Sequence, residues 1–152
     1  IVIDKLKKIE IKNFIFTGGE PLLNENITNI IEYTKSTDNK VELITNGTLL
    51  NGKFNKLLNL VDIINISLDH IDKEKNSITR RGSEKYNILD YILSMPENIK
   101  SKINIKMVIT KYNQKELQDI KKYFKIMDFL FLQQFLFLII LVKLKKFLIL
   151  IL

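Results

Sequence analysis

Short apolar segments alternate with amphipathic segments along residues 1–127, and this alternation limits the possible folds more than any other feature of the sequence. Apolar runs typical of β-strands occupy four segments: 13–17, 41–45, 63–68 and 103–109. A helical turn or two is expected at 4–8, and apolar residues recur at helical spacing in four longer segments: 24–34, 54–61, 84–93 and 116–127. Single helices between consecutive strands imply parallel pairing and right-handed crossovers. The sequence therefore predicts an α/β fold with a parallel sheet, either open or closed into a barrel.

Three local expectations accompany this pattern. Asn24 stands where a side chain can cap the helix that follows. Tyr86 shares a helical face with Leu89 and Leu93 and is expected to point inward. His70, the single histidine, lies in a predicted loop, and we expect an exposed loop residue there rather than a ligand or a base.

Each of the first three predicted strands ends in a polar motif. The motifs are TGGEP at 17–21, TNG at 45–47 and SLD at 67–69. In parallel sheets, ligand sites lie at the carboxyl ends of the strands. The sequence therefore predicts a ligand site where these motifs meet.

The first motif has a chemistry of its own. Gly18 and Gly19 allow the backbone to come close to a ligand. Glu20 adds a carboxylate that suits an ammonium group, and Pro21 fixes the direction of the chain toward the next helix. A phosphate-binding loop would instead use a lysine and a helix amino terminus, which this motif lacks. The alternative is a tight turn with a solvent-exposed Glu20.

Five motifs in order resemble the core of radical S-adenosylmethionine (radical SAM) enzymes, in the branch of the peptide maturases and the molybdenum-cofactor cyclase. They are FTGGEPLL (16–23), ITNGTLL (44–50), ISLD (66–69), RRG (80–82) and IKMVITKYN (105–113). The resemblance implies a partial radical SAM core over residues 1–128, folded as an incomplete parallel (β/α)6 partial TIM-like barrel. It also implies SAM and a [4Fe–4S] cluster at the carboxyl ends of the strands.

The resemblance assigns SAM contacts to individual positions. It implies that the Gly18–Pro21 segment holds the methionine amino group of SAM, that Asn46 lines the same binding site, and that Ser67 and Asp69 face the ribose. It further implies that Arg81 pairs with the SAM carboxylate and that Val108 and Ile109 pack near the adenine. Each position also has a structural alternative: turn chemistry for Asn46, a backbone hydrogen bond for Ser67, a loop cap for Asp69, a surface charge for Arg80 or Arg81, and core packing for Val108 and Ile109.

The departure from the family that matters most is that the chain contains no cysteine. The family holds its cluster by a CxxxCxxC loop, which in family order would precede Ile1, and Asp or His cannot replace these thiolates. We therefore expect no metal ligand and no catalytic residue here. One hypothesis is an inactive fragment of an oxygen-sensitive, cytoplasmic enzyme that cleaves SAM to a 5′-deoxyadenosyl radical for hydrogen abstraction, in peptide or cofactor maturation. The other is a cluster-free SAM-binding or scaffold protein, so the sequence leaves open whether this chain is an enzyme.

The resemblance also bears on partners. A full-length form would take electrons from a donor such as flavodoxin or ferredoxin. The sequence does not identify its substrate; the likeness to the peptide maturases suggests a peptide. The net charge of +7 comes from scattered lysines mixed with acids, which does not predict nucleic-acid binding.

Residues 129–152 differ from the rest in composition. They are rich in Phe, Leu, Ile and Lys, and their longest apolar run is eight residues. A membrane span needs roughly 20 apolar residues, so we expect a low-complexity, frameshift-like tail rather than a span, with a membrane-surface segment as the alternative. A further strand could lie near 128–132.

Overall fold

The computed structural model describes residues 2–50 and 52–126. The low-complexity tail at 129–152 and the further strand considered near 128–132 lie outside these residues. No helix in the described ranges is long and apolar enough to cross a bilayer.

The described fold centres on a parallel sheet of four strands in the order β1-β2-β3-β4. The strands are β1 (Asn13–Phe16), β2 (Lys40–Thr45), β3 (Ile63–Ser67) and β4 (Ile103–Lys106). Phe14 pairs with Val41, Leu43 with Ile64, and Ile66 with Ile105. The predicted α/β class and parallel pairing are therefore confirmed.

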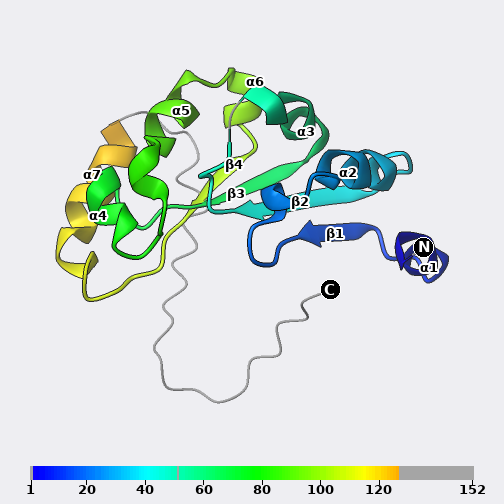
Figure 1. The fold of residues 1–152 in the computed structure, drawn as a ribbon, viewed down its shortest axis with the longest axis horizontal. Helices are drawn as coiled ribbons and strands as arrows, with labels where there is room; N and C mark the ends of the chain where they lie inside the picture. The colour runs from blue at the N-terminus through cyan, green and yellow to red at the C-terminus, as the bar shows by residue number, and fades with distance from the viewer. Residues whose placement is uncertain (1, 51, 127–152) are drawn as a thin grey trace, which may run out of the picture.

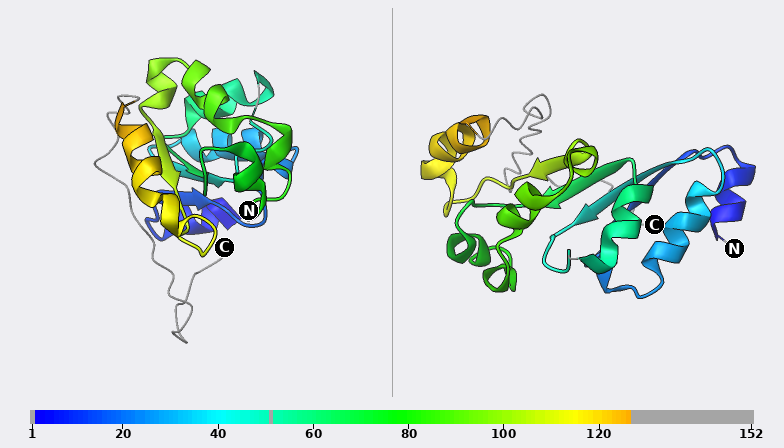
Figure 2. Two further views of the ribbon diagram at one scale, coloured as in Figure 1. Left: turned by 90° about the vertical axis from the view of Figure 1, so that its left-hand side faces the viewer. Right: turned by 90° about the horizontal axis from the view of Figure 1, so that it is seen from above.

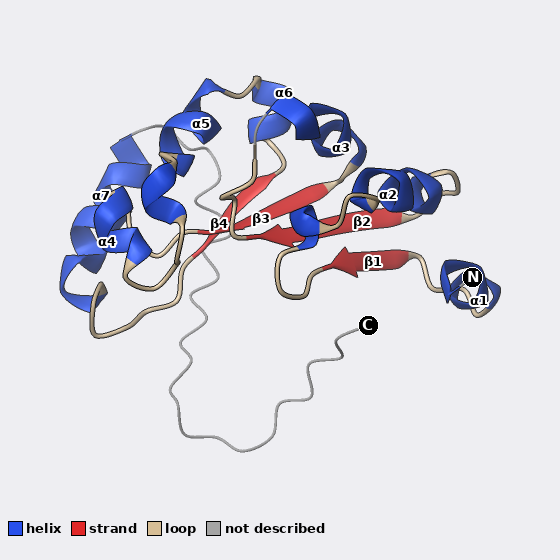
Figure 3. Cartoon of the chain, viewed as in Figure 1, coloured by secondary structure: helices blue, strands red, loops and turns tan. Residues whose placement is uncertain are grey.

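Helices cover one face of this sheet and extend beyond its ends. The α-helices are α1 (Val2–Lys8), α2 (Ile27–Lys35), α3 (Asn55–Leu60), α4 (Lys73–Ser77), α5 (Ile88–Ser94), α6 (Glu97–Lys100) and α7 (Leu117–Ile126). Helices α2, α3, α5 and α6 lie on one face of the sheet (Figures 1 and 3). Helices α4 and α7 lie beyond the carboxyl ends of the strands, where a ligand site is expected (Figure 2).

The core lies between the sheet and the covering helices. Because side chains alternate along a strand, one set points toward the helices and is buried. Four aliphatic side chains with no exposed surface lie at its centre, one from each of two strands and two helices: Leu43, Ile64, Ile31 and Leu57. Truncating such a side chain costs about 2–5 kcal/mol, so this layer holds the strand ends in register.

The opposite face of the sheet is covered by none of the described helices; it carries Ile15, Ile44 and Ile63 together with a group of polar side chains. We call it the open face; its residues alternate with the core residues and include Glu42, Asn46, Asn65, Ser67, Asn104 and Lys106. The carboxyl ends of the strands therefore present a mouth lined by polar side chains.

Two local expectations were wrong. Tyr86 is 54% exposed, because α5 begins at Ile88 and not near residue 84. Asn87 sets this start, since its side chain accepts a hydrogen bond from the backbone N–H of Asp90. Asn26, not Asn24, holds the cap position of α2; the Asn24 side chain instead accepts from the N–H of Asn26 at 2.9 Å and shapes the preceding turn.

Candidate functional site

Glu20 ties the turn after β1 to the end of β2. Its Oε1 accepts hydrogen bonds from the Leu22 N–H at 3.1 Å and the Thr45 hydroxyl at 2.7 Å. Its Oε2 accepts one from the Asn46 N–H at 2.8 Å. A carboxylate can accept about four hydrogen bonds, so one position on Oε2 is left for a ligand. Glu20 is thus half-buried and anchored, unlike the exposed turn residue of the alternative interpretation.

The glycines before Glu20 border open space. A Cβ added at Gly18 or Gly19 would meet no atom within 4 Å. Gly18 has a φ of +135°, which only glycine adopts easily. Gly19 has no positive φ, so neither backbone conformation nor packing explains a glycine there. Close approach by a ligand would explain it.

Part of the motif after β2 serves to shape the turn that follows the strand. The Asn46 Oδ1 accepts from the Thr48 N–H at 2.9 Å and from the Thr48 hydroxyl at 2.7 Å. Gly47 has a φ of +76°, and an added Cβ would lie 3.1 Å from a methyl carbon of Ile66. The structural alternative therefore accounts for Gly47 and for the Asn46 side-chain oxygen. The Asn46 amide nitrogen donates to no described residue and can serve a ligand.

Ser67 ends β3 on the open face. It is half-buried, and its hydroxyl forms no hydrogen bond with a described residue. The register places it beside Lys106 on β4, one strand away from Asn46. Its hydroxyl is therefore free to donate to, or accept from, a molecule in the mouth.

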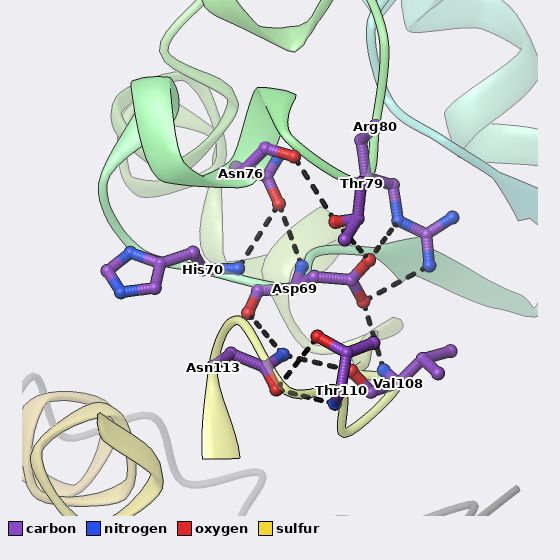
Figure 4. Close-up of polar contacts among 8 residues, drawn as sticks. All are labelled: Asp69, His70, Asn76, Thr79, Arg80, Val108, Thr110 and Asn113. Carbon is purple, nitrogen blue, oxygen red and sulfur yellow. Dashed lines mark hydrogen bonds and ion pairs between the residues drawn. The ribbon is translucent and has the colours of Figure 1, made fainter. Parts of the chain in front are cut away.

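Asp69 is buried, and protein donors fill its carboxylate completely (Figure 4). Its Oδ2 accepts from the Thr79 hydroxyl at 2.8 Å and from Arg80 Nε at 2.9 Å. Its Oδ1 accepts from Arg80 Nη2 at 3.2 Å and from the Val108 N–H at 2.9 Å. With four acceptor positions filled, the carboxylate joins β3, the loop at 79–80 and the end of β4.

Two buried asparagines, which sequence reasoning did not single out, hold the backbone around Asp69. The Asn76 Oδ1 accepts from the N–H groups of Asp69 at 2.8 Å and His70 at 3.1 Å. The Asn113 Nδ2 donates to the carbonyl oxygens of Asp69 and Val108, both at 2.9 Å (Figure 4). Asn113 ends the motif IKMVITKYN at 105–113 and could have been found there, whereas Asn76 belongs to none of the motifs.

The structure also places the remaining predicted contacts. Arg80 is the arginine bound to Asp69, and the neighbouring Arg81 is exposed. Val108 and Ile109 are half-buried beyond β4, and the Val108 backbone is fixed by Asp69. Pro21 begins a 3-10 turn at Pro21–Leu23, directly after Glu20, where its ring fixes the backbone φ.

His70 corrects the expectation of an exposed loop residue, because it is 5% exposed. Its Nδ1 accepts from the Asp72 N–H at 2.8 Å, and its Nε2 contacts the Glu116 carboxylate. Lys75 reaches the same carboxylate at 2.8 Å. Lys75 and then His70 hold the pKa of Glu116 below its usual value. Lys75 and His70 thus tie α4 and its preceding loop to the turn before α7.

The described residues contain no group of three or more side chains suited to a metal ion. A [4Fe–4S] cluster does not fit the residues present, because all 152 residues together include no cysteine. An S-adenosylmethionine molecule does fit, since the mouth offers a carboxylate position, glycines open to approach and a free hydroxyl.

Comparison with known proteins places the chain in a family. A family model described as the radical SAM superfamily matches residues 2–124. The chain belongs to this superfamily. Members of the superfamily use SAM and a [4Fe–4S] cluster, and this radical SAM chain lacks cysteines for the latter.

Relatives of the chain include a GTP 3′,8-cyclase of Chlorobaculum tepidum, 36% identical over 104 residues, which cover 64% of this chain and 31% of that protein. A GTP 3′,8-cyclase of Clostridium perfringens is 32% identical over 123 residues, covering 78% of this chain and 38% of the relative. A structure of anSMEcpe with bound AdoMet and the Cp18Cys peptide has a TM-score of 0.57 at 25% identity, covering 77% of this chain and 35% of that one. The chain therefore spans about a third of the length of these relatives, and the likeness to both branches is confirmed.

Proposed function

We propose that this chain forms the SAM-binding part of a radical SAM core. The observation that carries the proposal is the vacant acceptor position on Glu20 Oε2, directly beside Gly18 and Gly19. An ammonium group needs an anionic acceptor and close access to the backbone, and this turn supplies both. Its anchoring to Thr45 and Asn46 orients the carboxylate before any ligand arrives.

The other SAM contacts follow from the arrangement of the mouth. Ser67 and the Asn46 amide would hydrogen-bond the ribose, with Val108 and Ile109 beside the adenine. We propose that Asp69 supports this site without contacting the ribose, because all four of its acceptor positions are filled. Arg81 remains the proposed partner of the SAM carboxylate, since Arg80 uses its Nε and Nη2 on Asp69.

The proposed activity of the 152 residues is binding of SAM without its cleavage. Reductive cleavage to a 5′-deoxyadenosyl radical belongs to forms of the protein that hold a cluster, and no residue here can replace its thiolates. A flavodoxin- or ferredoxin-like electron donor, a cytoplasmic location and a role in peptide or cofactor maturation are proposed for such a form alone. The absence of cysteine also favours the second candidate, a cluster-free SAM-binding protein derived from this fold.

Equilibrium dialysis of the 152-residue chain with radiolabelled SAM tests the proposal. Glu20→Gln should weaken binding about tenfold or more, because a hydrogen bond to a charged group contributes about 1.5–3 kcal/mol. Glu25→Gln is the matched control, because Glu25 is exposed in the same loop. Thr45→Val removes one structural donor to Glu20 and reports how far anchoring alone affects binding. Absence of saturable binding by the parent chain, or equal affinities of the Glu20 and Glu25 variants, would contradict the proposal.

A further inference from the structure

Lys106 is a half-buried cation on the open face, at the end of β4. No hydrogen bond or ion pair joins its side chain to a described residue. Other lysines around the sheet do have acidic partners, such as Lys35 with Asp62 at 2.9 Å and Lys75 with Glu116 at 2.8 Å. A charged group that gives up part of its hydration gains from an anion that replaces the lost water. Lys106 is therefore suited to an anionic ligand.

Among the described strands, Glu42 is the one acidic side chain on this face, and it is hydrogen-bonded to a residue other than Lys106. Glu42 lies on β2, two strands from Lys106, and its Oε1 accepts from the Asn65 amide. Asn65 is 1% exposed, and its Oδ1 accepts in turn from the Asn104 Nδ2 at 3.4 Å. This row of side chains leaves the charge of Lys106 uncompensated and holds Asn104 beside it.

Asn104 and Lys106 present donors to the same space. They stand two residues apart on β4, so both side chains project from the open face. The Asn104 amide has two hydrogens and uses one on Asn65, which leaves the second for a ligand. Lys106 supplies a point charge of the kind that binds phosphate and carboxylate oxygens.

We propose that Lys106 and Asn104 bind an anionic oxygen group, phosphate or carboxylate, of a small-molecule substrate. Calling the ligand a substrate rests on the proposed function: Ser67 pairs with Lys106 in the sheet register and also borders the proposed SAM position. A group held at Lys106 thus lies beside the place where SAM would present its ribose. The anion site itself requires no SAM.

The site is tested by NMR titration of the isotope-labelled 152-residue chain at constant ionic strength and without SAM. The probes are sodium triphosphate for the phosphate source and glutarate for the carboxylate source. We expect saturable shifts of the Asn104 and Lys106 amides and of the Lys106 Cε resonance with one of the two probes. The probe that saturates identifies the source.

The matched variants are Lys106→Met and Lys40→Met. Lys40 lies on the same face at the amino end of β2. Replacing either lysine by methionine removes one positive charge, so the two variants have the same net charge. Lys106→Met should weaken binding about tenfold, Lys40→Met should leave it unchanged, and Lys106→Arg should retain most of it. If Lys106→Met does not fold, the Lys106 and Lys40 Cε shifts of the parent chain still decide the question. No saturable shift with either probe, or equal effects at Lys40 and Lys106, would overturn the proposal and leave SAM binding untouched.

Discussion

The Asp69 carboxylate and the Arg80 guanidinium form a two-point ion pair, with Nε–Oδ2 at 2.9 Å and Nη2–Oδ1 at 3.2 Å. The Asp69 side chain is 5% exposed and that of Arg80 is 23% exposed. The pair joins the end of β3 to the loop before α5, and the same carboxylate also binds the Val108 N–H. It thereby sets the spacing of the strand ends around the mouth.

Asp69→Asn should destabilise the fold by about 3 kcal/mol, because breaking a buried pair leaves a partner without compensation. Arg81→Gln, a change in the exposed neighbour, should shift stability by less than about 0.5 kcal/mol. Urea unfolding at pH 7 measures both. A double-mutant cycle with Arg80→Gln should show coupling between positions 69 and 80; additive effects would mean that the pair carries little of the stability.

Asn113→Ala should cost about 1–3 kcal/mol, since two carbonyl oxygens and the Thr110 N–H lose a buried partner. Gln114→Ala is the control, because Gln114 is exposed. Hydrogen exchange at the Val108 amide should accelerate in the Asn113 variant alone. Unchanged exchange would show that the end of β4 is held by other contacts.

Gly47→Ala and Gly19→Ala should separate packing from ligand access. At Gly47, a φ of +76° and a contact of 3.1 Å with Ile66 predict a loss of about 1–3 kcal/mol. At Gly19, where an added Cβ meets nothing within 4 Å, stability should stay within about 0.5 kcal/mol while SAM binding weakens. Thermal melts with and without SAM measure both effects. Full SAM affinity in Gly19→Ala would contradict the proposed approach of the ligand.

Acid should destabilise the chain partly through Asp62. Burial alone would raise the pKa of Asp62, but the Val41 N–H at 2.7 Å and Lys35 at 2.9 Å outweigh it and hold the pKa below 3.8. A folded-state pKa below the unfolded value contributes stability above pH 3.8, which is lost as pH falls through the lower folded value. Asp62→Asn should therefore flatten the pH dependence of unfolding free energy below about pH 4. Asp38→Asn, at an exposed position, should not; parallel curves for Asp62→Asn and the parent would refute this account.

Much of the fold could be predicted from the sequence, because the spacing of apolar residues along a strand or helix indicates which side chains are buried. The strand at 41–45 and the helix around Ile31 follow from spacing alone, and the GGEP, TNG and SLD motifs were correctly expected at one edge of the sheet. The limits of α5 were not predictable in this way, because a single side-chain hydrogen bond at Asn87 decides where the helix starts.

The polar network around Asp69 could not be predicted, because its partners come from distant positions. Asn113 lies 44 residues from Asp69 along the chain, and nothing in the local sequence distinguishes Arg80 from Arg81. The burial of His70 was not predictable for the same reason: its ring contacts Glu116, 46 residues away along the chain. Spacing identifies elements, whereas side-chain pairing at the strand ends requires three-dimensional contacts.

The most direct test of the proposed SAM site is an amide chemical-shift map of the 152-residue chain during titration with SAM. Binding at the proposed place predicts saturable shifts at Gly18, Gly19, Asn46 and Ser67, with Glu20→Gln suppressing them. Shifts confined to other surfaces, or none up to millimolar SAM, would contradict the assignment of this mouth as the SAM site.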